Sequence, residues 1–178
     1  TQIFKQGEVP QQYRKDALTA IAKRGQQDNL NDILDVAMDG FVRHKRDVSD
    51  ELATIEDAAR KRQVRADRRL DRLQQIIAGG EEASAIAAMN VAAALKVKAL
   101  ESLLKSYADH DNRNYAKTAM AALVAINPSA AQSVLTNLTN ARYPLDLRLI
   151  AVSQLANLDA SAAAKLGVGL LSKLDKPE

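Results

Sequence analysis

The chain has 178 residues, of which 47% are apolar and only 3% aromatic, and its formal net charge is +3 at pH 7. It has no cysteine, which excludes disulfides, thiol catalysis, zinc–thiolate sites and haem-c attachment. No apolar stretch of about eighteen residues occurs, so no membrane span is predicted, and the Ala- and Leu-rich, Gly- and Pro-poor composition is typical of an all-α protein.

A first helical pair is predicted over residues 11–40. Pro10 stands where a helix would begin and Gly25 where it would end. Asp28 is the predicted cap of the second helix, and Gly40 is expected near the end of that helix. The apolar side chains of the first helix recur at helical spacing and are expected in the core: Tyr13, Ala17, Leu18, Ile21 and Ala22.

The central segment, residues 49–108, has no Pro, and its only glycines are Gly79 and Gly80. Ser49 is the predicted cap of a helix that continues to residue 78. Because nothing breaks the apolar pattern on either side of the two glycines, we expect two long helices, over residues 49–78 and 81–109, that form an antiparallel hairpin. The alternative is that each long helix breaks near its centre into shorter helices.

Two further pairs are predicted over residues 112–140 and 145–173. Asn127, followed by Pro128, and Asp159 are predicted caps. The two pairs repeat with a period of about 32 residues, and "SAA" occurs at the same place in both, which indicates an α-solenoid. The sequence therefore predicts a single all-α repeat domain over residues 1–178, with about four antiparallel helix pairs and a longer central hairpin.

Three segments resemble HEAT repeats: "VPQQYRKDALTAIAKRG", "NYAKTAMAALVAINPSAAQSVLTNL" and "YPLDLRLIAVSQLANLDASAAAKLGVGLL". They cover the two ends of the chain well and the centre poorly. The resemblance implies an α-solenoid that recognises another protein. The form P-x-x-x-R-x-x-A-(L/V)-x-x-(I/L)-A is also similar, more weakly, to repeats of large secreted bacterial proteins that join a predicted dehydrogenase propeller to a haem-c domain. That likeness implies a periplasmic or secreted location and, because Cys is absent, no haem site.

The chain begins at Thr1 rather than Met, and we therefore expect a fragment of a larger protein.

The run "ARKRQVRADRRLDRL" at residues 59–73 raises the question of a polyanion site. On one continuous helix, four of its cations would share a face, and the basic loop at residues 43–47 would add to this face if both lie on one side of the array. We expect the possible interaction face to consist of these seven residues: Lys61, Arg65, Arg68, Arg72, Arg43, Lys45 and Arg46.

Nucleic-acid binding through the stripe at residues 60–72 is the alternative function. However, residues 47–82 carry nine acids against seven bases, and no aromatic residue is interleaved to stack on a base. We therefore interpret the run as a salt-bridged helix face, and as a protein contact before a nucleic-acid contact.

Three arginines are expected to have structural roles rather than binding roles. Arg62 interrupts the apolar stripe of the first central helix, so either its head reaches water along the groove or it pairs with an acid of a neighbouring helix. Arg14 and Arg148 stand at equivalent places after Pro10 and Pro144, and each is expected to bond a carbonyl or an acid of an adjacent repeat.

No catalytic, cofactor or metal site is predicted. His44 and His110 lie in predicted loops with no second His or Cys near them, and we interpret both as solvated. "DHDNRN" at residues 109–114 lacks the features of a calcium loop and is expected to cap a helix at Asp111 or Asn112.

The expected function is that of a non-catalytic scaffold that binds a protein or neighbouring domains of its own chain, with no cofactor and no evident small-molecule substrate. An enzyme such as a HEAT-like DNA glycosylase is disfavoured, because handling a base normally needs aromatic side chains.

Overall fold

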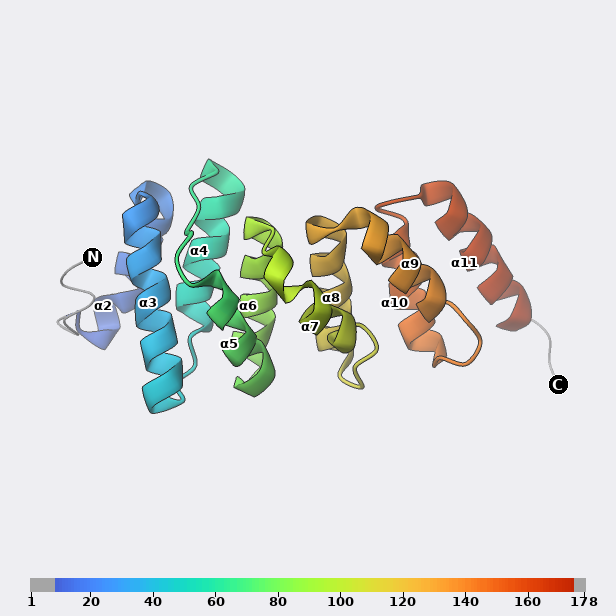
Figure 1. The fold of residues 1–178 in the computed structure, drawn as a ribbon, viewed down its shortest axis with the longest axis horizontal. Coiled ribbons are helices and arrows are strands. Elements are labelled where there is room, and N and C mark those ends of the chain that lie inside the picture. Colours follow the sequence, from blue (N-terminus) through green and yellow to red (C-terminus); the bar gives the residue numbers. More distant parts are fainter. Residues whose placement is uncertain (1–8, 175–178) are drawn as a thin grey trace. The chain divides into compact units, whose positions relative to one another are not determined.

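A computed structural model of the chain describes residues 9–174. These residues form α-helices and two short 3₁₀ helices joined by loops, and no strand occurs among them. The predicted all-α class is confirmed. The helices belong to two compact units, Thr1–Leu100 and Glu101–Glu178 (Figure 1).

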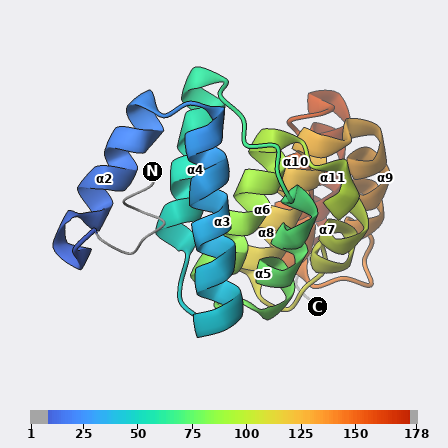
Figure 2. The same ribbon diagram turned by 60° about the vertical axis from the view of Figure 1, so that its left-hand side comes forward.

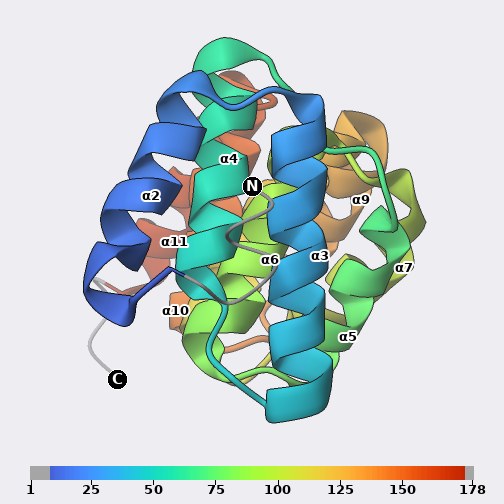
Figure 3. The ribbon, with the colours of Figure 1, turned by 90° about the vertical axis from the view of Figure 1, so that its left-hand side faces the viewer.

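The first unit is built around α4. Its elements in chain order are α2 (Gln11–Arg24), α3 (Gln27–His44), α4 (Ser49–Arg62), η1 (Leu70–Arg72), α5 (Leu73–Gly79), α6 (Glu82–Leu95) and η2 (Lys98–Leu100). The central helix packs against α2, α3 and α6, while α5 packs against α6 (Figures 2 and 3). Leu52 and Ile55 on α4 have no exposed surface, so the core of this unit lies along the inner face of that helix.

Small side chains allow α6 to pack closely against its neighbours. Ala85, Ala88 and Ala92 are fully buried, and most of the other positions of α6 are also buried. A helix that is apolar on nearly every side is expected where neighbours cover it on more than one face. The alanine-rich composition therefore serves the contacts of α6 with α4 and α5.

The predicted continuous helix over residues 49–78 is wrong. The helix α4 ends at Arg62, because Gln63 takes a left-handed backbone conformation with φ of 59°. Residues 63–69 then form a non-helical segment that leads to η1. Glutamine is a good helix former and no Gly or Pro marks the break, so the sequence shows no local sign of it.

Asn31 holds this segment against α3. Its side chain is buried, its Oδ1 accepts hydrogen bonds from the backbone N–H groups of Asp67 (2.9 Å) and Arg68 (3.2 Å), and its Nδ2 donates to Asp67 Oδ1 (3.0 Å). Ala66, just before them, is also buried. These bonds satisfy backbone groups that a continuous helix would have paired internally. The shorter helices weighed as the alternative are the ones observed.

The second predicted long helix, over residues 81–109, is also wrong. The helix α6 ends at Leu95, because Lys96 is left-handed with φ of 55°. The N–H of Val97 donates to the Ala92 carbonyl at 2.9 Å and the N–H of Lys96 to the Ala93 carbonyl at 3.2 Å, which is the bonding pattern of a Schellman motif. A lysine occupies the position that glycine most often takes in such a motif.

The second unit contains α7 (Glu101–Tyr107), α8 (Arg113–Ile126), α9 (Pro128–Leu138), α10 (Leu145–Leu155) and α11 (Ala160–Leu174). Here α8 packs against α7, α9 and α10, and α10 packs against α9 and α11. Three predicted caps are confirmed: side-chain oxygens of Asn112, Asn127 and Asp159 accept bonds from the first turns of α8, α9 and α11.

Other local predictions in the first unit are wrong. Asp28 lies inside the first turn of α3 instead of preceding it. Ser49 is the first residue of α4 and does not cap it, since its N–H and hydroxyl both bond to Asp47. Tyr13, expected in the core, is 56% exposed.

Candidate functional site

Four of the seven basic residues of the predicted interaction face were expected to share one helix, and they do not. Lys61 lies on α4, Arg65 and Arg68 lie on the segment after it, and Arg72 lies on η1. The predicted helical face is therefore wrong, because the chain leaves the helix at Gln63.

Most of these cations are ion-paired within the first unit. The pairs are Lys61 with Asp57 (2.6 Å), Arg68 with Asp28 (3.0 Å), Arg43 with Asp39 (2.7 Å) and Arg46 with Glu51 (2.8 Å). The Lys45 ammonium lies 4.9 Å from the centre of the Phe41 ring. Arg65 and Arg72 are exposed and make no ion pair with any described residue. The interpretation of the run as a salt-bridged helix face is confirmed for Lys61 on α4. Arg68 is also ion-paired, but it lies outside any helix.

Two of the seven residues, Arg43 and Arg72, line one groove between α3 and η1, with a volume of about 260 Å³. Arg69 joins them, with its Nη1 3.8 Å from Asp35 Oδ1. Val42, which also lines the groove, is 51% exposed. We call this the α3–η1 groove. It combines guanidinium groups with an exposed aliphatic side chain, and guanidinium groups are enriched at protein contacts.

Arg46 forms an ion pair with Glu51 and so has a structural role. That carboxylate is only 1% exposed and accepts hydrogen bonds from both Arg46 and Arg14. The Arg46 guanidinium lies against Gly40, where a Cβ would come within 2.6 Å of its Nη2 atom. A glycine inside α3 thus leaves room for the arginine that reaches the buried carboxylate.

The expectation for the two equivalent arginines is confirmed. Arg14, on α2, pairs with Glu51 of α4. Arg148, on α10, donates from Nε to the Thr139 carbonyl at the end of α9 (3.1 Å). One bonds an acid and the other a carbonyl of a neighbouring helix.

Arg62 does neither of the things expected of it. Its guanidinium donates to the carbonyls of Lys23, at 3.2 Å, and of Gly25, at the C-terminal end of α2. No acid pairs with it among residues 9–174. A cation at this end of a helix is favoured by the partial negative charge of the last carbonyls. The arginine therefore fixes the end of α2 to the end of α4.

The loop between α3 and α4 is held by Ser84 of α6. This hydroxyl is 1% exposed, accepts from the Val48 N–H (2.9 Å) and donates to Asp47 Oδ1 (2.6 Å). Burial acts to raise the pKa of the Asp47 carboxyl, but the hydrogen bonds from Ser84 and Ser49 and the charge of Arg46 outweigh it and lower the pKa below its ordinary value.

The histidines lie in different surroundings. His44 is exposed at the end of α3, as expected. His110 is half-buried: its ring stacks on Tyr107 with centroids 5.3 Å apart and meets Tyr115 edge-on at 5.0 Å. Its Nδ1 accepts from the Asn112 N–H at 3.0 Å, which places the proton of a neutral ring on Nε2. The expectation of a solvated His110 is wrong.

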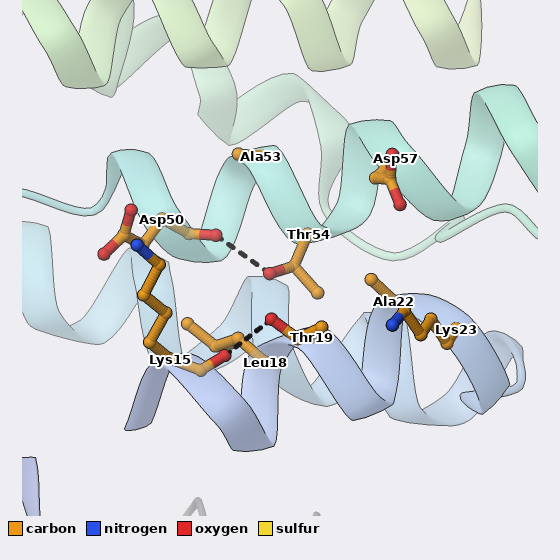
Figure 4. A pocket seen from close by; sticks show the side chains of 9 residues that line it. All are labelled: Lys15, Leu18, Thr19, Ala22, Lys23, Asp50, Ala53, Thr54 and Asp57. Carbon is orange, nitrogen blue, oxygen red and sulfur yellow. Dashed lines mark hydrogen bonds between the residues drawn. The ribbon is translucent and has the colours of Figure 1, made fainter. Parts of the chain in front are cut away.

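A second groove of the first unit, of about 300 Å³, lies between α2 and α4 (Figure 4). The hydroxyls of Thr19 and Thr54 point into it, but each donates to a carbonyl of its own helix at 2.9 Å. No set of unsatisfied donors or paired acids converges in this groove, so it offers no constellation for catalysis. Its walls carry opposite charges: Lys15 and Lys23 on α2, and Asp50 and Asp57 on α4.

Residues 9–174 hold neither a metal-ligand cluster nor a membrane-spanning helix. No cluster of three or more His, Asp or Glu side chains is placed to hold a metal ion, and no helix of this region has both the length and the apolarity needed to cross a membrane.

No protein-family model, curated protein or solved structure matches the chain. The likeness of its two ends to HEAT repeats therefore stays a prediction from the sequence.

Proposed function

We propose that the chain is a non-catalytic helical-repeat scaffold that binds another protein or another domain of its own chain, and that the α3–η1 groove is a contact surface. The observation that carries this proposal is the chemistry of the groove. Arg43, Arg69 and Arg72 line it together with the exposed side chain of Val42. Arginine is among the residues that contribute most to protein association, and an exposed aliphatic neighbour adds area to bury.

The packing pattern supports the HEAT-like solenoid that belongs to this proposal. In the first unit α4 packs against both α2 and α6, and in the second α10 packs against α8. Helices two apart in chain order are thus neighbours, which is the relation that stacked helical pairs produce. Proteins built in this way usually act in recognition, so the inference from fold to function is one of analogy.

Nucleic-acid binding is the weaker proposal, because the basic run has few unpaired charges. Lys61 and Arg68 each have an acidic partner, and Asp35 and Asp39 lie among the arginines of the α3–η1 groove. Binding to phosphates releases counterions in proportion to the number of cations that reach them. A face whose cations are already paired gains little from such contacts.

The test compares partner capture by the wild-type chain with that by a Val42→Ser/Arg72→Ala variant. Both side chains are exposed, so the variant is expected to keep its fold. We expect proteins retained by the wild type to be depleted about tenfold or more on the variant, because losing a central arginine and its apolar neighbour costs at least 1.4 kcal/mol, roughly, of binding free energy. Quantitative mass spectrometry of the captured proteins measures this depletion.

Lys117→Ala is the matched control, since Lys117 is an exposed cation on α8, outside the groove. Equal retention by all three proteins would contradict the proposed contact surface. Fluorescence polarisation with labelled single-stranded DNA and double-stranded RNA at about 50 mM salt tests the alternative. Salt-sensitive binding that Arg65→Ala and Arg72→Ala weaken would favour nucleic acid over protein as the partner.

A further inference from the structure

A third cavity lies wholly in the second unit, between the loop that joins α9 to α10 and the face of α11. Its volume is about 400 Å³. Thr139 and Ala141 line it from the loop, Arg148 from α10, and Lys165 and Gly169 from α11. Its size falls in the range of cavities that hold small ligands. We call it the α11 pocket.

The charges of the α11 pocket have one sign. Its lining includes the cations Arg148 and Lys165 and no acid, whereas both grooves of the first unit are lined by Asp as well as by Lys or Arg. Acids are rare in this part of the sequence: Asp146 and Asp159 are the only ones between residues 127 and 174. Asp146 is bound to Arg113, at 2.5 Å, and Asp159 caps α11. Neither lines the pocket.

One hydrogen bond fixes the Arg148 guanidinium and leaves its terminal groups available. Nε donates to the Thr139 carbonyl at 3.1 Å, while no described residue accepts from the two terminal amino groups. Among residues 9–174, only Arg62 Nε is a buried side-chain nitrogen or oxygen without a hydrogen-bond partner. The unpaired terminal amino groups of Arg148 are therefore accessible to solvent. Lys165 is exposed. The pocket is therefore lined by two cations, the hydrogen-bonded Arg148 and the exposed Lys165, and by no acidic side chain.

Gly169 is a second, independent feature of the pocket. Glycine inside a helix is unfavourable relative to alanine, so its use normally has a local reason. At this position the fold supplies none, because a Cβ would meet no atom within 4 Å. The glycine therefore widens the cavity on the side of α11 and lets a bound molecule approach the helix backbone.

We propose that the α11 pocket binds a carboxylate joined to a short aliphatic body. The carboxylate contacts the terminal amino groups of Arg148 and the ammonium of Lys165, and the aliphatic part packs on Leu166 and Leu170 beside Gly169. A planar guanidinium matches a carboxylate in two parallel hydrogen bonds, and a charge-assisted pair of this kind is stronger than a neutral one. This inference concerns the second unit and does not rest on the proposed role of the α3–η1 groove.

The test is a titration of the ¹⁵N-labelled chain, followed by NMR, at about 50 mM salt to limit screening. The probes are N-acetyl-Ala-Leu with a free C-terminal carboxylate, the same dipeptide as its C-terminal amide, and pentanoate. We expect the free acid to shift the amide signals of residues 139–141 and 165–170. The amide should bind about tenfold more weakly or worse, because it lacks the charged hydrogen bonds. If the dipeptide binds more tightly than pentanoate, the natural ligand is a peptide C-terminus. If pentanoate binds more tightly, the natural ligand is a free carboxylic acid.

Two variants make the test specific. A Cβ at Gly169 would meet no atom within 4 Å, and the bulk of Gly169→Leu is placed at the pocket wall, so we expect this variant to weaken binding of the acid about tenfold. Val168→Leu adds its bulk at a neighbouring position that is 67% exposed and outside the pocket, and it should bind like the wild type. Equal binding of acid and amide, unchanged binding by Gly169→Leu, or no shift at about 10 mM of either acid would each overturn the proposal.

Discussion

Buried polar side chains fix the loops and helix ends of the first unit. Asn31 and Ser84 each bond backbone groups about 36 residues away along the chain, and Glu51 and Arg62 bond partners at comparable separations. Asn31, Ser84 and Glu51 are buried, so their bonds satisfy polar groups that would otherwise be buried without a partner. A single replacement is therefore expected to loosen a whole segment, because its cost includes the desolvation of the groups left behind.

Replacement of Ser84 by Ala removes the link between α6 and the loop before α4. The Val48 N–H loses its acceptor and the Asp47 carboxylate loses its shortest hydrogen bond. We expect the free energy of unfolding to fall by about 1–3 kcal/mol near neutral pH, the usual cost of an unsatisfied buried group. Urea denaturation of the two proteins measures this difference.

The ionised form of Asp47 gives part of this stability a pH dependence. Its pKa is lowered in the folded chain, so the unfolded chain binds the proton more readily. The contribution is complete above the unfolded value of about 3.9 and is lost as the pH falls through the folded value. We expect Asp47→Asn to destabilise the chain near pH 7, and the difference from the wild type to shrink below about pH 4.

Asp109→Asn, a change of the same kind in an exposed loop position, is the control for Asp47→Asn. A difference between wild type and Asp47→Asn that stays constant from about pH 7 to about pH 3 would contradict the role assigned to the ionised carboxylate.

Residue roles were predictable where the partner is near in sequence. Asn112, Asn127 and Asp159 were expected as caps because a cap bonds backbone groups two or three residues away. The partners of Arg62 lie 37 and 39 residues away, so its position on an apolar stripe marked it as unusual without naming the carbonyls it meets.

At the scale of elements, the helices whose ends carry proline, glycine or a capping residue were predicted well. The central segment, residues 49–108, was not. Proline, glycine and capping residues mark the ends of α2, α9 and α10. The breaks after α4 and α6 fall at Gln63 and Lys96, which have no special preference for the left-handed conformation. The segment after Gln63 is held by Asn31, a buried polar residue of α3, and this residue was the one available sign of the first break.

The effect of Lys96→Gly on the free energy of unfolding distinguishes a chain that breaks at residue 96 from one that continues there as a helix. With a left-handed residue at this position, Lys96→Gly relieves the crowding between Cβ and the following carbonyl, and we expect a gain of about 1 kcal/mol in the free energy of unfolding. In a continuous helix over residues 81–109, the same substitution would cost about 1 kcal/mol. Chemical denaturation distinguishes the two signs.

Lys98→Gly is the comparison for that experiment, because Lys98 lies in η2 and its φ is not positive. It should be neutral or destabilising. A loss of stability in both variants would support a helix that continues through residue 96.

At the scale of the whole molecule, the chain is a sequence of locally packed helices with two cores. Leu52 of α4 belongs to the first unit and Met120 of α8 to the second, and both are fully buried. Helices pack mainly on elements close to them in chain order, such as α4 with α6 and α8 with α10. When each element contacts only its neighbours, stability is a sum of local terms, and distant parts can open separately.

A cavity in one core should therefore affect one unit more than the other. We expect Leu52→Ala and Met120→Ala each to cost about 2–5 kcal/mol locally, the usual range for such truncations. Hydrogen exchange followed by mass spectrometry should show faster exchange in α3–α6 for Leu52→Ala and in α8–α11 for Met120→Ala. Because the two residues belong to different units, we expect the effects in the double variant to add. Equal loss of protection in both units after either substitution would mean that the chain unfolds as one cooperative body, and the nearest-neighbour description of its stability would then fail.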